Sequence, residues 1–92
     1  SLYRFKVRNK NVYLADSLDI FNLEYLISMS SCVITCHGAT SHLSNMYKKK
    51  LLDIIDFSED KIFKKWNNHF VDCKIIYRTN FNDLSKKILT CL

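Results

Sequence analysis

Four short runs of apolar and β-branched residues alternate with helical patterns along the chain, and this alternation restricts the fold more than any other feature. The runs lie at residues 12–15, 32–36, 51–55 and 73–77. They are mostly apolar, as strands covered by helices on both faces are. Strands that alternate with helices form a parallel sheet through right-handed crossovers. We therefore predict an α/β fold, a three-layer Rossmann-like domain with a four-stranded, mainly parallel sheet and alternating helices.

The segments between and after these runs carry helix signals. An earlier helix is expected over about 19–30, and a short helix is expected after the turn at 37–42. Ser58, followed by two acidic residues, is expected to start another helix. In the last segment Asn80 precedes apolar residues spaced as one face of a helix, namely Phe81, Leu84, Ile88, Leu89 and Leu92. Asn80 is the expected N-cap of that helix.

The first ten residues leave two alternatives open. They form either an extra strand of the sheet, or a hairpin partner of 12–15 through a turn at 8–11. Ninety-two residues make one domain at most, so residues 1–92 are expected to be a single α/β domain. The chain opens at Ser1 rather than at a methionine, and we expect it to be a piece of a longer protein.

Cysteine usage and charge suggest where the chain resides. Three of the four cysteines lie inside or beside apolar runs, which predicts reduced, buried thiols, and no secretion signal is visible. The expected location is cytoplasmic. The formal charge of +5 includes alternating basic residues over 4–10 and a cluster over 48–50. These residues indicate either solvated faces, or a surface for anionic lipid at the inner membrane face or for a phosphate-bearing ligand. No nucleic-acid partner is predicted, because the recognition motifs are missing.

Polar residues gather where each expected strand passes into a helix, at 16–19, 37–42, 56–59 and 78–80. Ligands of open parallel sheets bind at this edge. The second junction is the richest, since it contains the chain's single glycine, Gly38. A glycine there permits a positive φ or the close approach of a ligand to the backbone. Thr40 and Ser41 can cap the next helix or donate to phosphate, and His42 can reach the same space. The junction is therefore either an anion cradle or a tight turn with an N-cap.

Other chemistries at this junction fit the spacing poorly. Cys36 and His37 are neighbours on a strand and point to opposite faces, which makes them a poor nucleophile–base pair. Cys32 and Cys36 share a face but lie about 13 Å apart on an extended chain, too far to bind one zinc ion. His69 is remote and is interpreted as a surface residue near a helix end. We predict no metal site and assign no catalytic residue.

The central thirty residues resemble a known arrangement. Residues 22–35 read NLEYLISMSSCVIT, and after a polar turn Ser41-His42-Leu43 follows. This is similar to the C-terminal half of GT-B glycosyltransferases, with the nearest likeness in the heptosyltransferase-like family. Those enzymes have an Asp-Thr-Gly-x-x-His-Leu turn between a strand and a helix. With His42 aligned to the motif histidine, His37, Gly38 and Ala39 stand where the family has Asp, Thr and Gly.

The resemblance implies a fragment of the C-terminal domain that binds a nucleotide-diphosphate sugar as donor, without a metal or other cofactor. The whole protein would be a metal-independent glycosyltransferase acting on a glycan or lipid-linked acceptor, and the fragment alone is expected to be inactive. The residues expected to contact the donor are His37, Gly38, Thr40, Ser41, His42, Asp16, Asp56, Ser58 and Arg78. The alternative is a non-catalytic, flavodoxin-like α/β module whose basic residues bind a protein partner or an anionic surface.

Overall fold

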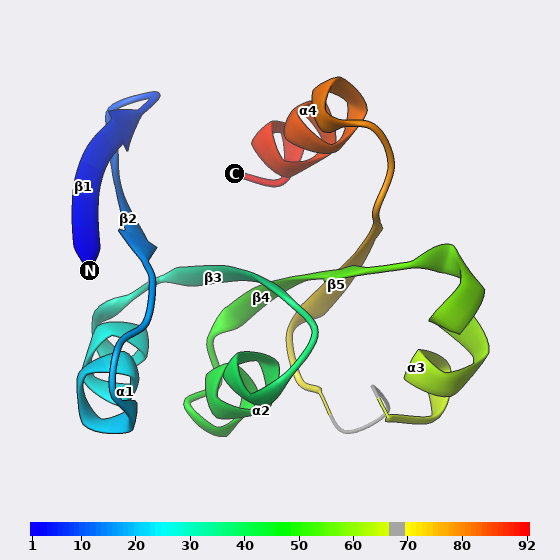
Figure 1. Ribbon diagram of the computed structural model, residues 1–92, viewed down its shortest axis with the longest axis horizontal. Helices are drawn as coiled ribbons and strands as arrows, with labels where there is room; N and C mark the ends of the chain where they lie inside the picture. Colours follow the sequence, from blue (N-terminus) through cyan, green and yellow to red (C-terminus); the bar gives the residue numbers. More distant parts are fainter. Residues whose placement is uncertain (67–69) are drawn as a thin grey trace.

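The computed structural model describes residues 1–66 and 70–92. Strands and helices alternate after an N-terminal hairpin (Figure 1). The elements in order are β1 (Leu2–Val7), β2 (Lys10–Ala15), α1 (Ile20–Met29), β3 (Cys32–Cys36), α2 (Ala39–Met46), β4 (Lys50–Ile55), the 3₁₀ turn η1 (Phe57–Glu59), α3 (Asp60–Trp66), β5 (Cys73–Tyr77) and α4 (Phe81–Cys91). All four expected strands form within a residue or two of their predicted positions, and each expected helix is present, although α2 begins at Ala39, inside the expected turn. The α/β class is therefore confirmed.

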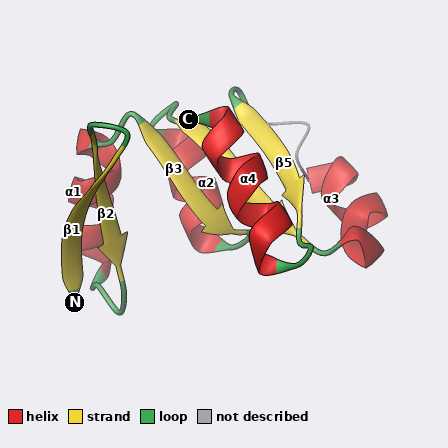
Figure 2. Cartoon of the chain, turned by 90° about the horizontal axis from the view of Figure 1, so that it is seen from above, coloured by secondary structure: helices red, strands yellow, loops and turns green. Residues whose placement is uncertain are grey.

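The main sheet has three parallel strands in the order β3-β4-β5. Val33 pairs with Leu51, and Asp53 pairs with Ile75. Helices α1, α2 and α3 lie on one side of this sheet and α4 lies on the other (Figure 1). Figure 2 shows α4 lying over the sheet from above. The central strand β4 is covered from both sides, and residues 51–55 are all buried.

The expected four-stranded sheet is wrong, because residues 12–15 belong to a separate two-stranded sheet. Strand β2 pairs antiparallel with β1, from Leu2 opposite Ala15 to Val7 opposite Lys10. Arg8 and Asn9 both have positive φ, as a tight two-residue hairpin turn requires. Of the two alternatives for residues 1–10, the hairpin is confirmed. An apolar run predicts a strand without predicting its partner, and the nearest neighbour in sequence closes the smaller loop.

Basic side chains join the hairpin and β4 to the end of α4. Arg8 donates to the carbonyl oxygen of Leu89 at 3.2 Å, and Lys10 donates to the carbonyl oxygen of Leu92. Lys50 donates to the carbonyl oxygen of Cys91 at 2.7 Å. The last carbonyls of a helix lack partners within it and carry a partial negative charge. Three of the basic residues in the sequence clusters therefore stabilise a helix end.

The core between the sheet and α4 contains Leu52, Ile54 and Ile76, against which Leu84 and Ile88 pack. The helical spacing in the last segment predicted this face of α4. Phe81 does not join it and is 82% exposed. Phe81 is the first residue of α4 and comes directly after the loop from β5, so it lies beyond the part of the helix that covers the strands.

The predicted N-cap of α4 is confirmed, since the Asn80 side chain accepts from the Asp83 N–H at 2.9 Å. Asp83 accepts from the Thr79 hydroxyl at 2.8 Å and pairs with Lys87 at 3.2 Å. These contacts lower the pKa of Asp83, with the Thr79 hydrogen bond as the larger cause.

Within the described ranges, no helix has both the length and the apolar character that crossing a membrane requires.

Candidate functional site

The carboxyl ends of the three parallel strands meet at one edge of the sheet and bring three of the four predicted junctions together. The His37 N–H donates to the carbonyl oxygen of Ile54 at 3.2 Å, and the Arg78 N–H donates to that of Ile55 at 2.7 Å. Both bonds continue the sheet ladder past the strand ends. The loops after β3, β4 and β5 are therefore neighbours, as the rule for parallel sheets predicts.

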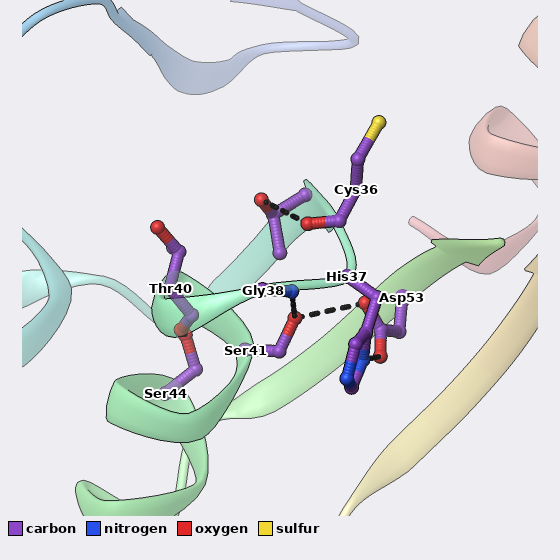
Figure 3. A network of polar contacts seen from close by, with 8 residues as sticks. Cys36, His37, Gly38, Thr40, Ser41, Ser44 and Asp53 are labelled. Carbon is purple, nitrogen blue, oxygen red and sulfur yellow. Dashed lines mark hydrogen bonds and ion pairs between the residues drawn. The ribbon is translucent and has the colours of Figure 1, made fainter. Parts of the chain in front are cut away.

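A network of polar contacts lies where β3 passes into α2 (Figure 3). The Nδ1 atom of His37 is 2.6 Å from Oδ2 of Asp53, and the Ser41 hydroxyl donates to Oδ1 of the same carboxylate at 2.9 Å. The Gly38 N–H donates to the Ser41 hydroxyl oxygen at 3.2 Å. Asp53 and Ser41 are fully buried, and the His37 side chain is 17% exposed. The predicted residues 37, 38 and 41 are thus joined through one aspartate.

Asp53 is the functional candidate that the sequence interpretation missed. It stands in the middle of β4, and its side chain reaches Ser41 of α2, on the sheet face opposite to α4. A single aspartate inside the run Leu-Leu-Asp-Ile-Ile is the signal that could have identified it. A charged residue is almost never fully buried unless it is paired, so an acid in a buried strand predicts a partner.

Gly38 is the N-cap of α2, but it does not have the positive φ of the left-handed region that the sequence suggested. Its φ of 167° is extended backbone. A Cβ built on Gly38 would meet only the carbonyl oxygen of Cys36, at 4.0 Å. Neither backbone conformation nor packing within the described chain therefore requires glycine at this position. Two reasons from the sequence prediction remain: glycine is a better N-cap than alanine, and it permits the close approach of a ligand to the backbone.

The first turn of α2 faces the same edge. Among the described residues, the N–H groups of Ala39 and Thr40 have no backbone or side-chain acceptor, as expected for the first turn of a helix. The carbonyl oxygen of Thr40 accepts from the Ser44 hydroxyl at 2.7 Å. These two N–H groups and the helix dipole would favour an anion.

Aromatic rings pack around His37. The His42 ring lies edge-on to it with centroids 5.4 Å apart, and Phe70 stacks on it at 6.2 Å. Phe70 also meets the His42 ring edge-on at 5.3 Å. His42 itself is exposed at the surface of α2. The two histidines predicted for this turn therefore lie side by side, and a phenylalanine from the segment before β5 completes the group.

Arg78 links the other two junctions to the first. Its guanidinium donates to the Cys36 sulfur at 3.0 Å, and its Nε lies 3.9 Å from the Asp56 carboxylate. Cys36 is exposed, so its predicted burial is wrong, whereas Cys32, Cys73 and Cys91 are half-buried and all four thiols are free. The bond to Arg78 and the bond of His37 to Asp53 show that residues 36 and 37 point to opposite faces, as predicted (Figure 3).

Two further predicted residues have different positions. Ser58 lies exposed in η1, after Asp56, and so belongs to the same edge of the sheet. Asp16 follows β2 in the two-stranded sheet, where its N–H donates to the carbonyl oxygen of Ser1 at 2.9 Å. The structure therefore does not place Asp16 at the edge where the other junctions meet, because the strand before it is not part of the parallel sheet.

A second polar contact near this edge was not predicted. The Tyr77 hydroxyl donates to the Asp60 carboxylate, which also pairs with Lys64 at 3.0 Å. The Tyr77 hydrogen bond, followed by Lys64, lowers the pKa of Asp60, and the same bond raises the pKa of Tyr77. The Phe57 ring packs edge-on to Tyr77 with centroids 5.2 Å apart. This contact holds the start of α3 against the end of β5.

In the part of the chain that the structure describes, no three His, Cys, Asp or Glu side chains are grouped so that they could hold a metal ion. His69, interpreted from the sequence as a surface residue, lies outside the described residues. No family model matches the chain, and no curated protein or solved structure matches it. The likeness to glycosyltransferases stays a prediction based on the residues of the central segment.

Proposed function

We propose that the carboxyl edge of the parallel sheet binds the diphosphate of a nucleotide-sugar, and that the chain is the donor-binding part of a metal-independent GT-B glycosyltransferase with a Rossmann-like domain. The observation that carries the proposal is Gly38, the only glycine, whose identity neither conformation nor packing explains. It begins a helix whose first N–H groups are available to an acceptor from outside the chain. The resemblance of residues 22–43 to the heptosyltransferase-like family points to the same turn.

The residues at this edge suit an anionic leaving group. In glycosyl transfer the acceptor hydroxyl oxygen bonds to the sugar carbon and loses its proton, while the bond from that carbon to the phosphate oxygen breaks and the nucleoside diphosphate leaves with the electron pair. N–H groups and cations that already point at the developing charge stabilise it. The N–H groups of Ala39 and Thr40, the His42 ring and the Arg78 guanidinium would supply these contacts. We assign no catalytic base.

The remaining predicted residues have supporting roles in this proposal. Asp56, which pairs with Arg78, and Ser58 are exposed and would meet ribose or sugar hydroxyls. Asp16 would contact the donor only through a movement of the hairpin, so we leave it out of the proposed site. The acceptor, a glycan or lipid-linked sugar, and any contact with an anionic membrane are implied by the resemblance alone.

The test is a titration of the ¹⁵N-labelled protein with ADP, UDP, CDP and GDP, followed by amide chemical shifts. We expect saturable shifts at residues 37–43 and at Arg78. Gly38→Ala should weaken binding at least about tenfold, or about 1.4 kcal/mol, because its methyl group would occupy the space of the phosphate. The same substitution should lower the free energy of unfolding by no more than about 1 kcal/mol, because an extended backbone accepts alanine but alanine is a poorer N-cap than glycine.

Thr90→Ala is the matched control, because Thr90 is an exposed residue near the C-terminal end of α4 and is not part of the proposed site. It should bind as the unmodified protein does. Shifts absent at millimolar nucleotide, or Gly38→Ala binding as well as the unmodified protein, would refute the proposal. In that case the alternative, a non-catalytic module for a protein partner or an anionic surface, predicts binding to vesicles that contain acidic lipid.

A further inference from the structure

Asp53 is the one ionisable side chain among the described residues that is fully buried. Its neighbours in β4 are apolar, and an apolar side chain would fill the same space without the cost of removing a charge from water. Packing therefore gives no reason for an acid at this position. The reason must come from the groups that the carboxylate binds.

Both contacts bring a hydrogen to the carboxylate. The Ser41 oxygen already accepts the Gly38 N–H, so its own hydrogen points to Oδ1 of Asp53. On the other side, Nδ1 of His37 lies 2.6 Å from Oδ2. An ionised carboxylate only accepts hydrogen bonds, so when Asp53 is ionised this contact requires the hydrogen of His37 to be on Nδ1. In that state Asp53 determines the tautomer of His37 and the orientation of its ring.

The same carboxylate spans the turn. It binds His37 before Gly38 and Ser41 after it, and the Gly38 N–H closes the ring of contacts through the Ser41 oxygen. One strand residue therefore holds both sides of the segment whose N–H groups and His42 belong to the proposed site, and the His37 ring that it holds packs against His42. Ser44 offers a contrast, since this second buried serine of α2 donates only to Thr40 of its own helix.

We propose that Asp53 is the positioning residue of the phosphate-binding turn: it holds His37 in the Nδ1–H tautomer and holds the first turn of α2 against β4. The role in ligand binding rests on the proposed function. The hold on His37 does not, and it is measured without any ligand. In metal sites, carboxylates that orient a ligating histidine act in the same way, and their loss typically lowers metal affinity about tenfold to a hundredfold.

The first measurement is the pair of imidazole ¹⁵N shifts of His37, recorded at a pH where the ring is neutral. We expect Nδ1 to carry the hydrogen in the unmodified protein. Asp53→Asn should reduce the share of this tautomer and move the amide shifts of residues 37–42. Ser44→Ala is the control and should leave the His37 tautomer as it is. A hydrogen on Nε2 alone in the unmodified protein would overturn the proposal, whether or not a variant folds.

The second measurement is the nucleoside diphosphate titration repeated on these variants. Asp53→Asn should bind at least about tenfold more weakly, and Ser44→Ala should bind as the unmodified protein does. Ser41→Ala removes one of the two contacts of the Asp53 carboxylate and replaces Asp53→Asn in this titration if that variant does not fold. Ser41→Ala should also weaken nucleotide binding. Equal affinity in a folded Asp53→Asn with an altered tautomer would overturn the positioning role. Failure of the unmodified protein to bind any of the four nucleotides, with the tautomer as expected, would refute the proposed function and the ligand role while the hold on His37 stands.

Discussion

Replacing Leu52 by alanine is the most direct test of how α4 packs on the sheet. The Leu52 side chain is fully buried at the centre of the core that joins β4 and β5 to α4. The substitution removes three carbon groups from this core, and at about 0.8 kcal/mol each the lost transfer energy is about 2.4 kcal/mol. The cavity that remains adds to this loss, because the strand on one side and the helix on the other cannot close it fully. We expect a total of about 3 to 4 kcal/mol.

The assay is urea denaturation followed by circular dichroism, with the free energy of unfolding extrapolated to water. For a domain of this size the expected loss would lower the melting temperature by about 15 to 25 °C. Phe81→Ala is the matched control, since it also removes a large apolar side chain from this region but from a position that is 82% exposed. It should change the free energy by less than about 0.5 kcal/mol.

A loss below about 1 kcal/mol for Leu52→Ala, with the dependence on urea unchanged, would refute this reasoning. It would mean that α4 does not cover Leu52 in solution. An equal loss for the two variants would refute it as well, because the structure assigns burial to one side chain and exposure to the other.

Two further predictions follow from the cysteines and from the cap of α4. Burial raises the pKa of the Cys73 thiol to about 11, against an ordinary value of 9.0, so its thiolate fraction at neutral pH should be about a hundredfold smaller than that of an ordinary thiol. Timed iodoacetamide labelling read by mass spectrometry should therefore modify the exposed Cys36 well before Cys73, and equal rates would contradict the burial. Asn80→Ala removes the side chain that accepts the Asp83 N–H, and urea denaturation should show a loss of about 1 kcal/mol in the free energy of unfolding. Asn80→Asp keeps an acceptor and should be about as stable as the unmodified protein. An Asn80→Ala variant with unchanged stability would argue against the cap.

Much of the fold was predictable because its signals are local. The strands at 32–36 and 73–77 were predicted to the residue, since short β-branched runs between polar segments have few other conformations available. The cap at Asn80 was predictable for the same reason, as an N-cap contacts only the next turn of its own helix. The strand that pairs with residues 12–15 was not predictable, because the same apolar run fits a parallel sheet and a hairpin equally well.

The candidate site was predictable in outline and not in its central contact. The edge of the sheet, and with it His37, Gly38, Ser41 and Arg78, follows from the rule that the carboxyl ends of parallel strands meet. That rule concerns the loops and passes over strand interiors, so it does not point to Asp53. The same rule wrongly placed Asp16 at this edge, because it was applied to residues 12–15, which do not belong to the parallel sheet.

The sequence alone determined which segments become strands and helices, and which polar residues stand at the ends of the parallel strands. These properties depend on side chains within a few positions of one another. The tertiary structure alone decided that β2 pairs with β1, that Gly38 is extended, and that Asp53 meets His37 sixteen positions away. The physical reason is that contacts between distant residues depend on the register of β4 against β3 and on how α2 packs over both strands. Neither the register nor the packing can be predicted from a local sequence pattern.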